Sequence, residues 1–338
     1  MTVNDTLDRP LRDLRISVTD RCNYRCLYCM PLEKYRWVKH AEVLTFEEVT
    51  RLAAIFLELG VQRIRLTGGE PLLRADVEVL VKMLAALPGL QELSMTTNGS
   101  LLAGRADALR AAGVDRLNVS LDTIDPDTFR TVSQRGELES VLQGLEAARE
   151  AGFAPIKVNT VVERGVNDHQ LLDMVDFARR EGHELRFIEY MDVGNANRWT
   201  LDKLVPAGEI LARINERYPV RAVDAPRGPA PARQYEYEDG GGRLGIVASV
   251  TTPFCGDCTR ARLTAEGALV TCLFAEDGTD LKGPMRNGAD DATLAGVIES
   301  VWRERADQFS EARLDALLSD DGYDPEERSK IEMIRLGG

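Results

Sequence analysis

The chain has 338 residues and carries 42 basic against 55 acidic side chains, which gives a formal net charge of −13. Hydrophobic residues make up 44% of the sequence and charged residues 29%, an ordinary balance that excludes a chain disordered throughout. No apolar run approaches the ~18 residues needed to cross a bilayer, and residues 1–10 lack the apolar core of a secretory signal. The acidic balance argues against general binding to nucleic acid or membrane surfaces, and we expect a cytoplasmic protein.

Between residues 14 and 190, short apolar segments alternate with segments of helical periodicity. A capping box of Thr45 and Glu48 marks the start of the first predicted helix, and Gly60 and Gly113 mark helix ends. Six βα units predict a parallel sheet, either an incomplete βα barrel or an open doubly wound sheet, with ligands bound at the carboxyl ends of the strands. The predicted strands are Leu14–Val18, Arg63–Thr67, Leu93–Thr97, Arg116–Leu121, Ile156–Val161 and Leu185–Tyr190, and the predicted helices are Thr45–Leu59, Ala75–Leu87, Gly104–Ala112, Glu137–Ala151 and Asp168–Glu181.

Small and polar residues gather at the ends of these predicted strands. Any one of them alone is explained by a cap or a turn, but polar residues at all six ends indicate one polar rim. This rim comprises Gly68-Gly69-Glu70-Pro71 after the second strand, Thr96-Thr97-Asn98-Gly99 after the third, Asn118, Ser120 and Asp122 on the fourth, Lys157 and Asn159 on the fifth, and Glu189 and Met191 at the sixth.

The regular alternation of strand and helix patterns ends around residues 192–245. Prolines and glycines in Asp224–Ala232 predict a flexible connection. Glycine-rich turns then predict two hairpins, Gln234–Glu238 with Arg243–Ser249 and Ala261–Thr264 with Ala268–Leu273. Helical segments near Asp291–Arg305 and Ser310–Ser319 follow, so this region is smaller and of mixed α and β character.

All six cysteines fall into two triplets, and none of the three histidines lies within either. The first triplet, Cys22, Cys26 and Cys29, has the spacing C-x3-C-x2-C in the loop after the first strand. Three thiolates there can hold three irons of a four-iron cluster and leave the fourth iron open to a small molecule. The alternative is a zinc knuckle with a remote fourth ligand.

The second triplet, Cys255, Cys258 and Cys272, has the spacing C-x2-C-x13-C. Taken alone it fits a zinc ribbon and an iron–sulfur cluster equally well, and Asp257 is a sterically doubtful oxygen ligand. The first triplet favours the iron–sulfur interpretation of the second. Arg260 and Arg262 follow directly, and on an extended segment both side chains would point to the same side, where guanidinium groups suit phosphate oxygens.

Two features of the chain resemble the radical S-adenosylmethionine superfamily. They are the first triplet, with Tyr28 before its last cysteine, and the segment Gly68-Gly69-Glu70-Pro71 at the end of the second strand. More of the chain resembles one of its families, which cyclises GTP in the first step of molybdenum cofactor biosynthesis. The segments that carry this likeness are Ser17–Arg21, Phe187–Gly194, Cys258-Thr-Arg260-Ala-Arg262 and the end Gly337-Gly338. Thr259 is a small departure, because such proteins often have Asn there.

The resemblance implies an α/β fold, an incomplete parallel (βα)6 triosephosphate-isomerase-type barrel with a smaller C-terminal α+β segment that caps its open side. Residues 1–200 would form the partial barrel with the first [4Fe-4S] cluster. Residues 201–338 would carry the second [4Fe-4S] cluster and the GTP contacts, and the Gly337-Gly338 tail would fold into the pocket.

The resemblance also implies roles at matching positions. The first triplet would bind the cluster that reduces S-adenosylmethionine, and together with Arg260 and Arg262 it forms the catalytic set. The cofactor would contact Tyr28, Gly69, Ser120 and Met191. The second cluster, on Cys255, Cys258 and Cys272, would face the guanine, and GTP would contact Arg15, Arg65, Thr96, Lys157, Arg260 and Arg262.

The implied reaction is reductive cleavage of S-adenosylmethionine to a 5′-deoxyadenosyl radical, hydrogen abstraction from C3′ of GTP, and attack on guanine C8. It needs a low-potential electron donor but little side-chain acid–base catalysis, which agrees with the shortage of histidine. A homodimer is left open. The alternatives are a radical enzyme that modifies a peptide with auxiliary clusters and a zinc-stabilised scaffold protein.

Overall fold

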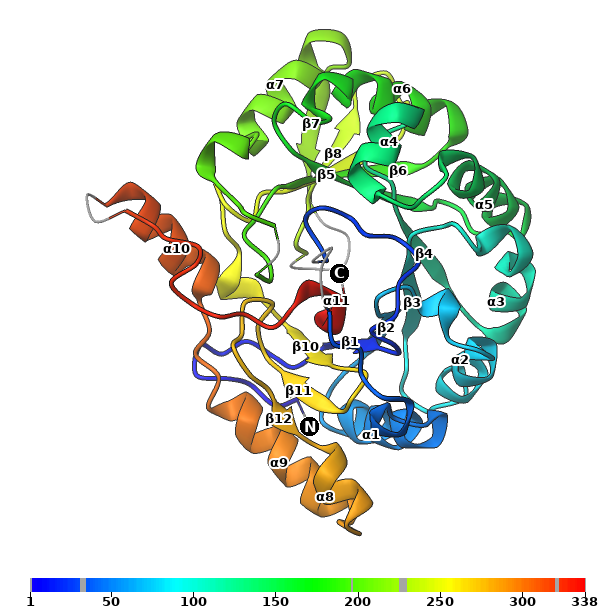
Figure 1. Ribbon diagram of the computed structural model, residues 1–338, viewed down its shortest axis with the longest axis vertical. Helices are drawn as coiled ribbons and strands as arrows, with labels where there is room; N and C mark the ends of the chain where they lie inside the picture. The colour runs from blue at the N-terminus through cyan, green and yellow to red at the C-terminus, as the bar shows by residue number, and fades with distance from the viewer. Residues whose placement is uncertain (1, 31–34, 196, 225–229, 320–321, 338) are drawn as a thin grey trace.

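A twelve-stranded sheet curves around a central space and forms the body of the molecule (Figure 1). The computed structural model describes residues 2–30, 35–195, 197–224, 230–319 and 322–337. The strand order is β12-β11-β10-β1-β2-β3-β4-β5-β6-β9-β8-β7, so the sheet has two edges and the barrel is not closed.

Six parallel strands form the middle of the sheet, and each lies within one residue of a predicted strand at both ends. The helices between them lie on the outside of the curve (Figure 1), which confirms the incomplete barrel and excludes the doubly wound alternative. The strands are β1 (Asp13–Ser17), β2 (Arg63–Thr67), β3 (Glu92–Thr97), β4 (Arg116–Ser120), β5 (Lys157–Val162) and β6 (Glu184–Glu189), and the helices are α1 (Phe46–Glu58), α2 (Val77–Ala85), α3 (Ala106–Ala112), α4 (Pro126–Ser133), α5 (Leu138–Glu150) and α6 (Leu171–Glu181).

The alternation of side chains along the strands separates the core from the cavity. On β1, Leu14 and Ile16 are buried in the hydrophobic core, whereas Arg15 between them lines the central cavity. On β2, Ile64 joins the same core and Arg65 lines the cavity. Closed βα barrels fill their interior with branched apolar side chains, so polar and cationic side chains at these inward positions indicate a binding site.

The first helix shows why the predicted helices form where they do. The hydroxyl of Thr45 accepts a hydrogen bond from the backbone N–H of Glu48, and the Glu48 carboxylate accepts one from the backbone N–H of Thr45. This confirms the predicted capping box. Val49, Leu52 and Phe56 then bury the face that packs on the sheet.

Strands from the C-terminal part extend the barrel sheet at both edges. β10 (Arg260–Leu263) pairs parallel with β1, and β9 (Arg243–Val247) pairs parallel with β6. Both predicted hairpins are present, but these second pairings were not predicted, because the sequence of a hairpin does not show which other strand it meets. The remaining elements are α7 (Ala207–Arg217), β7 (Val220–Val223), β8 (Arg233–Tyr237), β11 (Ala268–Val270) and β12 (Thr279–Asp280).

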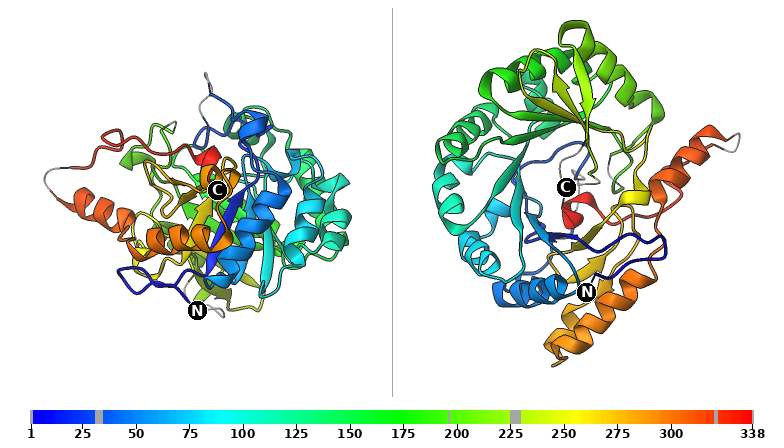
Figure 2. Two further views of the ribbon diagram at one scale, coloured as in Figure 1. Left: turned by 90° about the horizontal axis from the view of Figure 1, so that it is seen from below. Right: turned by 180° about the vertical axis from the view of Figure 1, so that it is seen from behind.

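The last helices close one side of the molecule. Figure 2 shows α8 (Lys282–Arg286), α9 (Asp291–Arg303) and α10 (Phe309–Leu318) flanking the barrel, and α11 (Met333–Leu336) lies inside the ring of strands (Figure 1). The predicted flexible connection Asp224–Ala232 lies largely outside the described residues. Within the described ranges, none of the helices is long and apolar enough to span a membrane.

Candidate functional site

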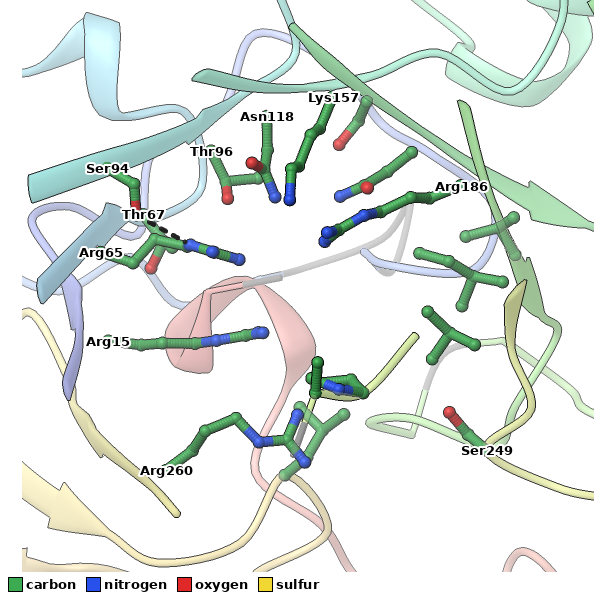
Figure 3. Close-up of a pocket in the computed structure, with 18 of the residues that line it drawn as sticks. Arg15, Arg65, Thr67, Ser94, Thr96, Asn118, Lys157, Arg186, Ser249 and Arg260 are labelled. Carbon is green, nitrogen blue, oxygen red and sulfur yellow. Dashed lines mark hydrogen bonds between the residues drawn. The ribbon is translucent and has the colours of Figure 1, made fainter. Parts of the chain in front are cut away.

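A cavity of ≈ 1040 Å³ lies inside the curved sheet. Strand ends of the barrel and loops of the C-terminal part line it together (Figure 3). The structure therefore brings both cysteine triplets into one chamber. Every site residue predicted from the sequence is among the lining residues: Arg15, Cys22, Cys26, Tyr28, Cys29, Arg65, Gly69, Thr96, Ser120, Lys157, Met191, Cys255, Cys258, Arg260, Arg262 and Cys272.

The first triplet lies in the loop after β1, and its backbone is held in a tight turn. The N–H of Cys29 donates to the carbonyl of Cys26 at 3.0 Å, and Arg25 donates to the carbonyl of Cys22 at 2.7 Å. Burial raises the pKa of Cys22 to about 11 and that of Cys29 to about 12, and it raises the pKa of Cys26 well above the usual thiol value. Because burial disfavours a bare thiolate, these sulfurs become anionic ligands only beside a bound cation.

The end of β2 approaches this loop so closely that it requires glycine. The N–H of Gly69 donates to the carbonyl of Thr19, and the N–H of Glu70 donates to the carbonyl of Arg21, both at 2.7 Å. A Cβ on Gly69 would collide with the backbone of Arg21. The glycine therefore lets backbone polar groups reach the edge of the cavity next to the first triplet.

Tyr28 is fixed by Asp122, which the sequence analysis placed on the polar rim without giving it a role. Its hydroxyl donates to Asp122 Oδ2 at 2.8 Å, and Asp122 Oδ1 accepts from the backbone N–H of Val161 at 2.8 Å. Burial raises the pKa of Asp122 to about 6. Its position two residues after Ser120 on the strand end was the only sequence signal for it.

A group of cationic side chains points into the cavity from separate strands. Figure 3 shows Arg15, Arg65, Lys157, Arg186 and Arg260 directed toward a common space. They come from β1, β2, β5, β6 and β10. Strand register places Arg15 opposite Arg65, and it places Lys157 opposite Glu184, two residues before Arg186. The sequence analysis missed Arg186, although it alternates with the core residues Leu185 and Phe187 and so belongs to the inward face of β6.

These cations are poorly neutralised by the protein. Burial lowers the pKa of Arg65 to about 10, and burial together with the nearby charge of Arg186 lowers the pKa of Lys157 to about 8. Glu184 is the carboxylate that Lys157 and Arg186 share, at 3.3 and 3.2 Å. Concentrated positive charge in a cavity with low-dielectric walls favours a multiply charged anion.

The second triplet lies beside this cationic group, at Arg260. Cys255 and Cys258 are in and directly after a short 3-10 turn (Cys255–Asp257) before β10, and Cys272 follows β11. Burial by itself raises the pKa of Cys258, but the guanidinium groups of Arg260 and Arg305 lower it to about 6. Arg260 Nη2 donates to Cys258 Sγ at 3.3 Å, so the cationic group and the second triplet are in direct contact.

The C-terminal tail reaches the cavity, as the sequence analysis expected. Arg262 Nη1 donates to the carbonyl oxygens of Leu336 at 3.2 Å and Gly337 at 2.6 Å. Gly337 has a φ of 71°, and a Cβ there would collide with the Thr67 side chain. Gly338 lies outside the described residues.

The six cysteines are the donor set to be tested against a bound metal group. In the parts of the chain that the structure describes, no three Cys, His, Asp or Glu side chains form a group that could hold one metal ion. A four-iron cluster makes a different demand, because each thiolate binds its own iron atom. The six cysteines are free thiols, and each triplet lines the cavity, which fits two such clusters.

Comparisons with known proteins match most of the chain. The Radical SAM superfamily matches residues 16–178, and the family Molybdenum Cofactor Synthesis C matches residues 183–311. A GTP 3′,8-cyclase of Acidothermus cellulolyticus is 50% identical over 99% of both chains. A GTP 3′,8-cyclase of Xanthomonas axonopodis pv. citri is 44% identical over 99% of both chains.

A solved structure gives the same fold at low sequence identity. Streptococcus suis SuiB bound to precursor peptide SuiA has a TM-score of 0.60 and 15% identity, over 98% of this chain and 77% of that chain. SuiB bound to S-adenosylmethionine has a TM-score of 0.59 and 14% identity, over 97% of this chain and 78% of that chain. These likenesses show the fold.

Proposed function

The chain belongs to the GTP 3′,8-cyclase family of radical S-adenosylmethionine enzymes, and we propose that its cavity binds S-adenosylmethionine and GTP together, each at its own [4Fe-4S] cluster. It is an enzyme of molybdenum cofactor biosynthesis, a lyase that works by radical chemistry. The observation that carries the proposed arrangement is that both cysteine triplets and the cationic group line the same cavity.

The first triplet would hold the cluster that binds S-adenosylmethionine. When bound, cluster and cofactor would supply the family's chemistry: reductive cleavage to a 5′-deoxyadenosyl radical and methionine, hydrogen abstraction from C3′ of GTP, and attack on guanine C8. One further electron from the donor and one proton would then complete (8S)-3′,8-cyclo-7,8-dihydroguanosine 5′-triphosphate. The close approach at Gly69 supports a backbone contact to the cofactor's amino acid part, and the Tyr28–Asp122 hydrogen bond would orient the tyrosine beside it. The remaining cofactor contacts would come from Ser120 and Met191.

The cationic group would bind the triphosphate of GTP. A triphosphate carries several negative charges, and guanidinium forks bind phosphate oxygens with charge-assisted hydrogen bonds. The lowered pKa values of buried Arg65 and Lys157 support this role, because an anion would relieve the repulsion among the cations. The proposed phosphate contacts are Arg15, Arg65, Thr96, Lys157, Arg260 and Arg262, to which Arg186 is added.

The second triplet would hold the cluster whose open iron faces the guanine. Arg260 donates to Cys258 Sγ, so one side chain would contact both the second cluster and the substrate. The tail, bound through Arg262, would help to close the chamber. Closure would keep both reactants near each other and exclude water and oxygen from the radical steps.

The other predictions from the sequence stay part of this proposal. Residues 1–200 would form the partial barrel with the first cluster, and residues 201–338 would carry the second cluster and GTP contacts. We also propose a low-potential electron donor, a cytoplasmic location and no binding to nucleic acid or membrane, with a homodimer left open.

An anaerobic incubation with reductant, S-adenosylmethionine and GTP tests the proposal. The expected products, identified by mass, are 5′-deoxyadenosine, methionine and the cyclised nucleotide, from a chain with about eight irons in two four-iron clusters. Stoichiometric zinc without iron, or deoxyadenosine formed without any change in GTP, would contradict it.

A further inference from the structure

A buried group of charged side chains lies next to the second triplet and comes from two segments far apart in the sequence. Asp5 and Arg9 belong to the segment before β1, and Arg305 follows α9. Their exposed fractions are 8%, 2% and 5%. We call these three side chains the charged anchor.

The carboxylate of Asp5 is the centre of the charged anchor. Its Oδ1 accepts hydrogen bonds from the backbone N–H groups of Leu7 at 3.0 Å and Arg9 at 2.9 Å. Its Oδ2 accepts from Arg9 Nε at 2.6 Å and from Arg305 Nη1 at 3.1 Å. The aspartate is therefore fully hydrogen-bonded and holds both guanidinium groups in fixed positions.

Both guanidinium groups hold the backbone of the second triplet. Arg9 Nη1 donates to the carbonyl oxygen of Cys255 at 2.8 Å and to that of Asp307 at 2.7 Å. Arg305 Nη1 donates to the carbonyl oxygen of Cys258 at 2.8 Å. Because these are the two cysteines that bracket the turn, the charged anchor fixes the turn at both of its ends.

The N-terminal segment is itself fixed to the end of α9. The indole Nε1 of Trp302 donates to the carbonyl of Arg9 at 3.1 Å, and the hydroxyl of Thr6 donates to the carbonyl of Arg305 at 2.7 Å. Trp302 is 1% exposed. The charged anchor is thus supported by packed neighbours on both sides, so its geometry is set before a cluster is bound.

The charged anchor carries more positive than negative charge. Two guanidinium groups share the carboxylate of Asp5, and the next carboxylate, Asp307, meets Arg305 Nε at 3.3 Å with its side chain 34% exposed. Nη2 of Arg9 is buried without a hydrogen-bond partner. A buried positive charge is costly unless an anion lies nearby, and the thiolates of a cluster would be that anion.

We propose that the charged anchor positions the second cluster and makes it easier to reduce. The anchor holds the carbonyl groups of Cys255 and Cys258, and the excess positive charge of the anchor favours the reduced form of the cluster. The inference rests on the proposed function, since it presupposes a cluster at the second triplet. Reduction adds negative charge to a cluster, and nearby positive charge and hydrogen bonds stabilise that form. Asp5, Arg9 and Arg305 are positioning residues in this account.

Two substitutions at one position separate charge from packing. Arg305→Gln keeps hydrogen-bond donors but removes the charge, and Arg305→Lys keeps the charge on a single nitrogen that can still reach Asp5 and the Cys258 carbonyl. Each full-length holoenzyme is purified anaerobically, and the reduction potentials of its clusters are measured by titration with electron paramagnetic resonance. Added S-adenosylmethionine identifies the signal of the first cluster, because it alters only the cluster that binds it.

The Gln variant should show a more negative potential for the second cluster and an unchanged potential for the first, and the Lys variant should keep both near the wild-type values. Arg9→Gln should lower the iron content from about eight toward about four per chain, while S-adenosylmethionine cleavage persists. Arg164→Gln is the control, since Arg164 also contacts a carboxylate and a carbonyl (Glu209 at 2.7 Å, Leu204 at 3.1 Å) away from the cysteines.

Three results would overturn the inference. An unchanged second-cluster potential in the Gln variant would contradict the effect of charge, and equal shifts in the Gln and Lys variants would assign the effect to packing. Loss of both clusters together in Arg9→Gln would show that Arg9 supports the fold as a whole and not the second turn, which would contradict its positioning role. A wild-type chain that holds iron only at the first triplet would instead refute the proposed second cluster itself, so the two failures are distinguishable.

Discussion

The two cysteine triplets line the same cavity but are built in different ways. Cys22, Cys26 and Cys29 lie within one loop, so local sequence is enough to bring them together. Cys255 and Cys258 precede β10, Cys272 follows β11, and antiparallel pairing of those strands assembles the set. The second triplet therefore depends on long-range packing that the first does not need.

Their electrostatic surroundings also differ. Burial raises the pKa of Cys22 to about 11, and the hydrogen-bonding side chains near it include the neutral Asn98. Cys258 is also buried, yet Arg260 and Arg305 lower its pKa to about 6. Burial also raises the pKa of Cys272 to about 11, so the contrast between the triplets lies at Cys258, where two guanidinium groups favour negative charge and suit a phosphorylated substrate.

Serine substitutions give the largest expected difference between the two triplets. Cys22→Ser should reduce S-adenosylmethionine cleavage to the background rate, because the cluster that binds the cofactor loses a ligand. Cys258→Ser should retain that cleavage and form no cyclised nucleotide. Chromatography of 5′-deoxyadenosine and the nucleotide product measures both. Equal loss of cleavage in the two variants would show that the triplets do not have separate tasks.

Thiol reactivity after removal of the clusters gives the next largest difference. With a pKa of about 6, Cys258 is mostly thiolate at pH 7, whereas Cys22, with a pKa of about 11, is about one part in 10,000 thiolate. Because nucleophilicity falls with pKa, the rate ratio toward a disulfide reagent should be roughly 100-fold in favour of Cys258. Mass mapping of the labelled cysteines measures each rate.

The pH dependence of labelling should differ in form as well. The rate at Cys258 should rise between pH 5 and 6 and level off above about 7, while the rate at Cys22 should keep rising about tenfold per pH unit through pH 9. Arg260→Ala should move the Cys258 curve to higher pH. Parallel curves for the two cysteines would refute the electrostatic difference.

Removal of a single cation at the second triplet should have a smaller effect. Arg260→Ala should weaken GTP binding by about 10- to 100-fold, the loss of one charge-assisted contact, and should leave S-adenosylmethionine affinity unchanged. Calorimetry under anaerobic conditions measures both affinities. Arg130→Ala is the control, because its side chain is 60% exposed and pairs with Asp127 on the surface. Unchanged GTP affinity in Arg260→Ala would show that Arg260 does not contact the phosphates.

The tail gives the smallest expected effect. Gly337→Ala should detach the tail from Arg262, because a Cβ would collide with Thr67 and because the positive φ at this position favours glycine. Gly322→Ala is the control, because Gly322 also has a positive φ, of 74°, but its Cβ would meet nothing within 4 Å. Hydrogen exchange over residues 333–337 should rise only in the first variant. Equal exchange in both would mean that Gly337 has no special contact with the cavity.

Much of the barrel could be predicted from sequence because its signals are local. Alternating strand and helix patterns gave β1–β6 within one residue, and the Thr45–Glu48 capping box gave the start of α1. Cysteine spacing and the polar strand ends were likewise enough to expect the first triplet and the polar rim, whereas the roles of Arg15 and Arg65 came from the family resemblance. These features depend on residues close together in the chain.

The rest depends on contacts between distant segments. The pairing of β10 with β1, which sets Arg262 beside Arg15, has no signature in either strand alone. Arg186 looked like any charged residue on a strand, and Asp5 and Arg305 meet across a separation of 300 residues. The sequence alone could not predict these contacts, because they depend on which distant segments pack together in the folded chain.

The transfer of one labelled hydrogen tests the shared chamber most directly. GTP carrying deuterium at C3′ is incubated anaerobically with reductant and S-adenosylmethionine, and the 5′-deoxyadenosine is analysed by mass. We predict that the deoxyadenosine carries the deuterium, because the cofactor at one triplet and the nucleotide at the other lie in reach of each other. Deoxyadenosine formed at the full rate without deuterium would contradict the account.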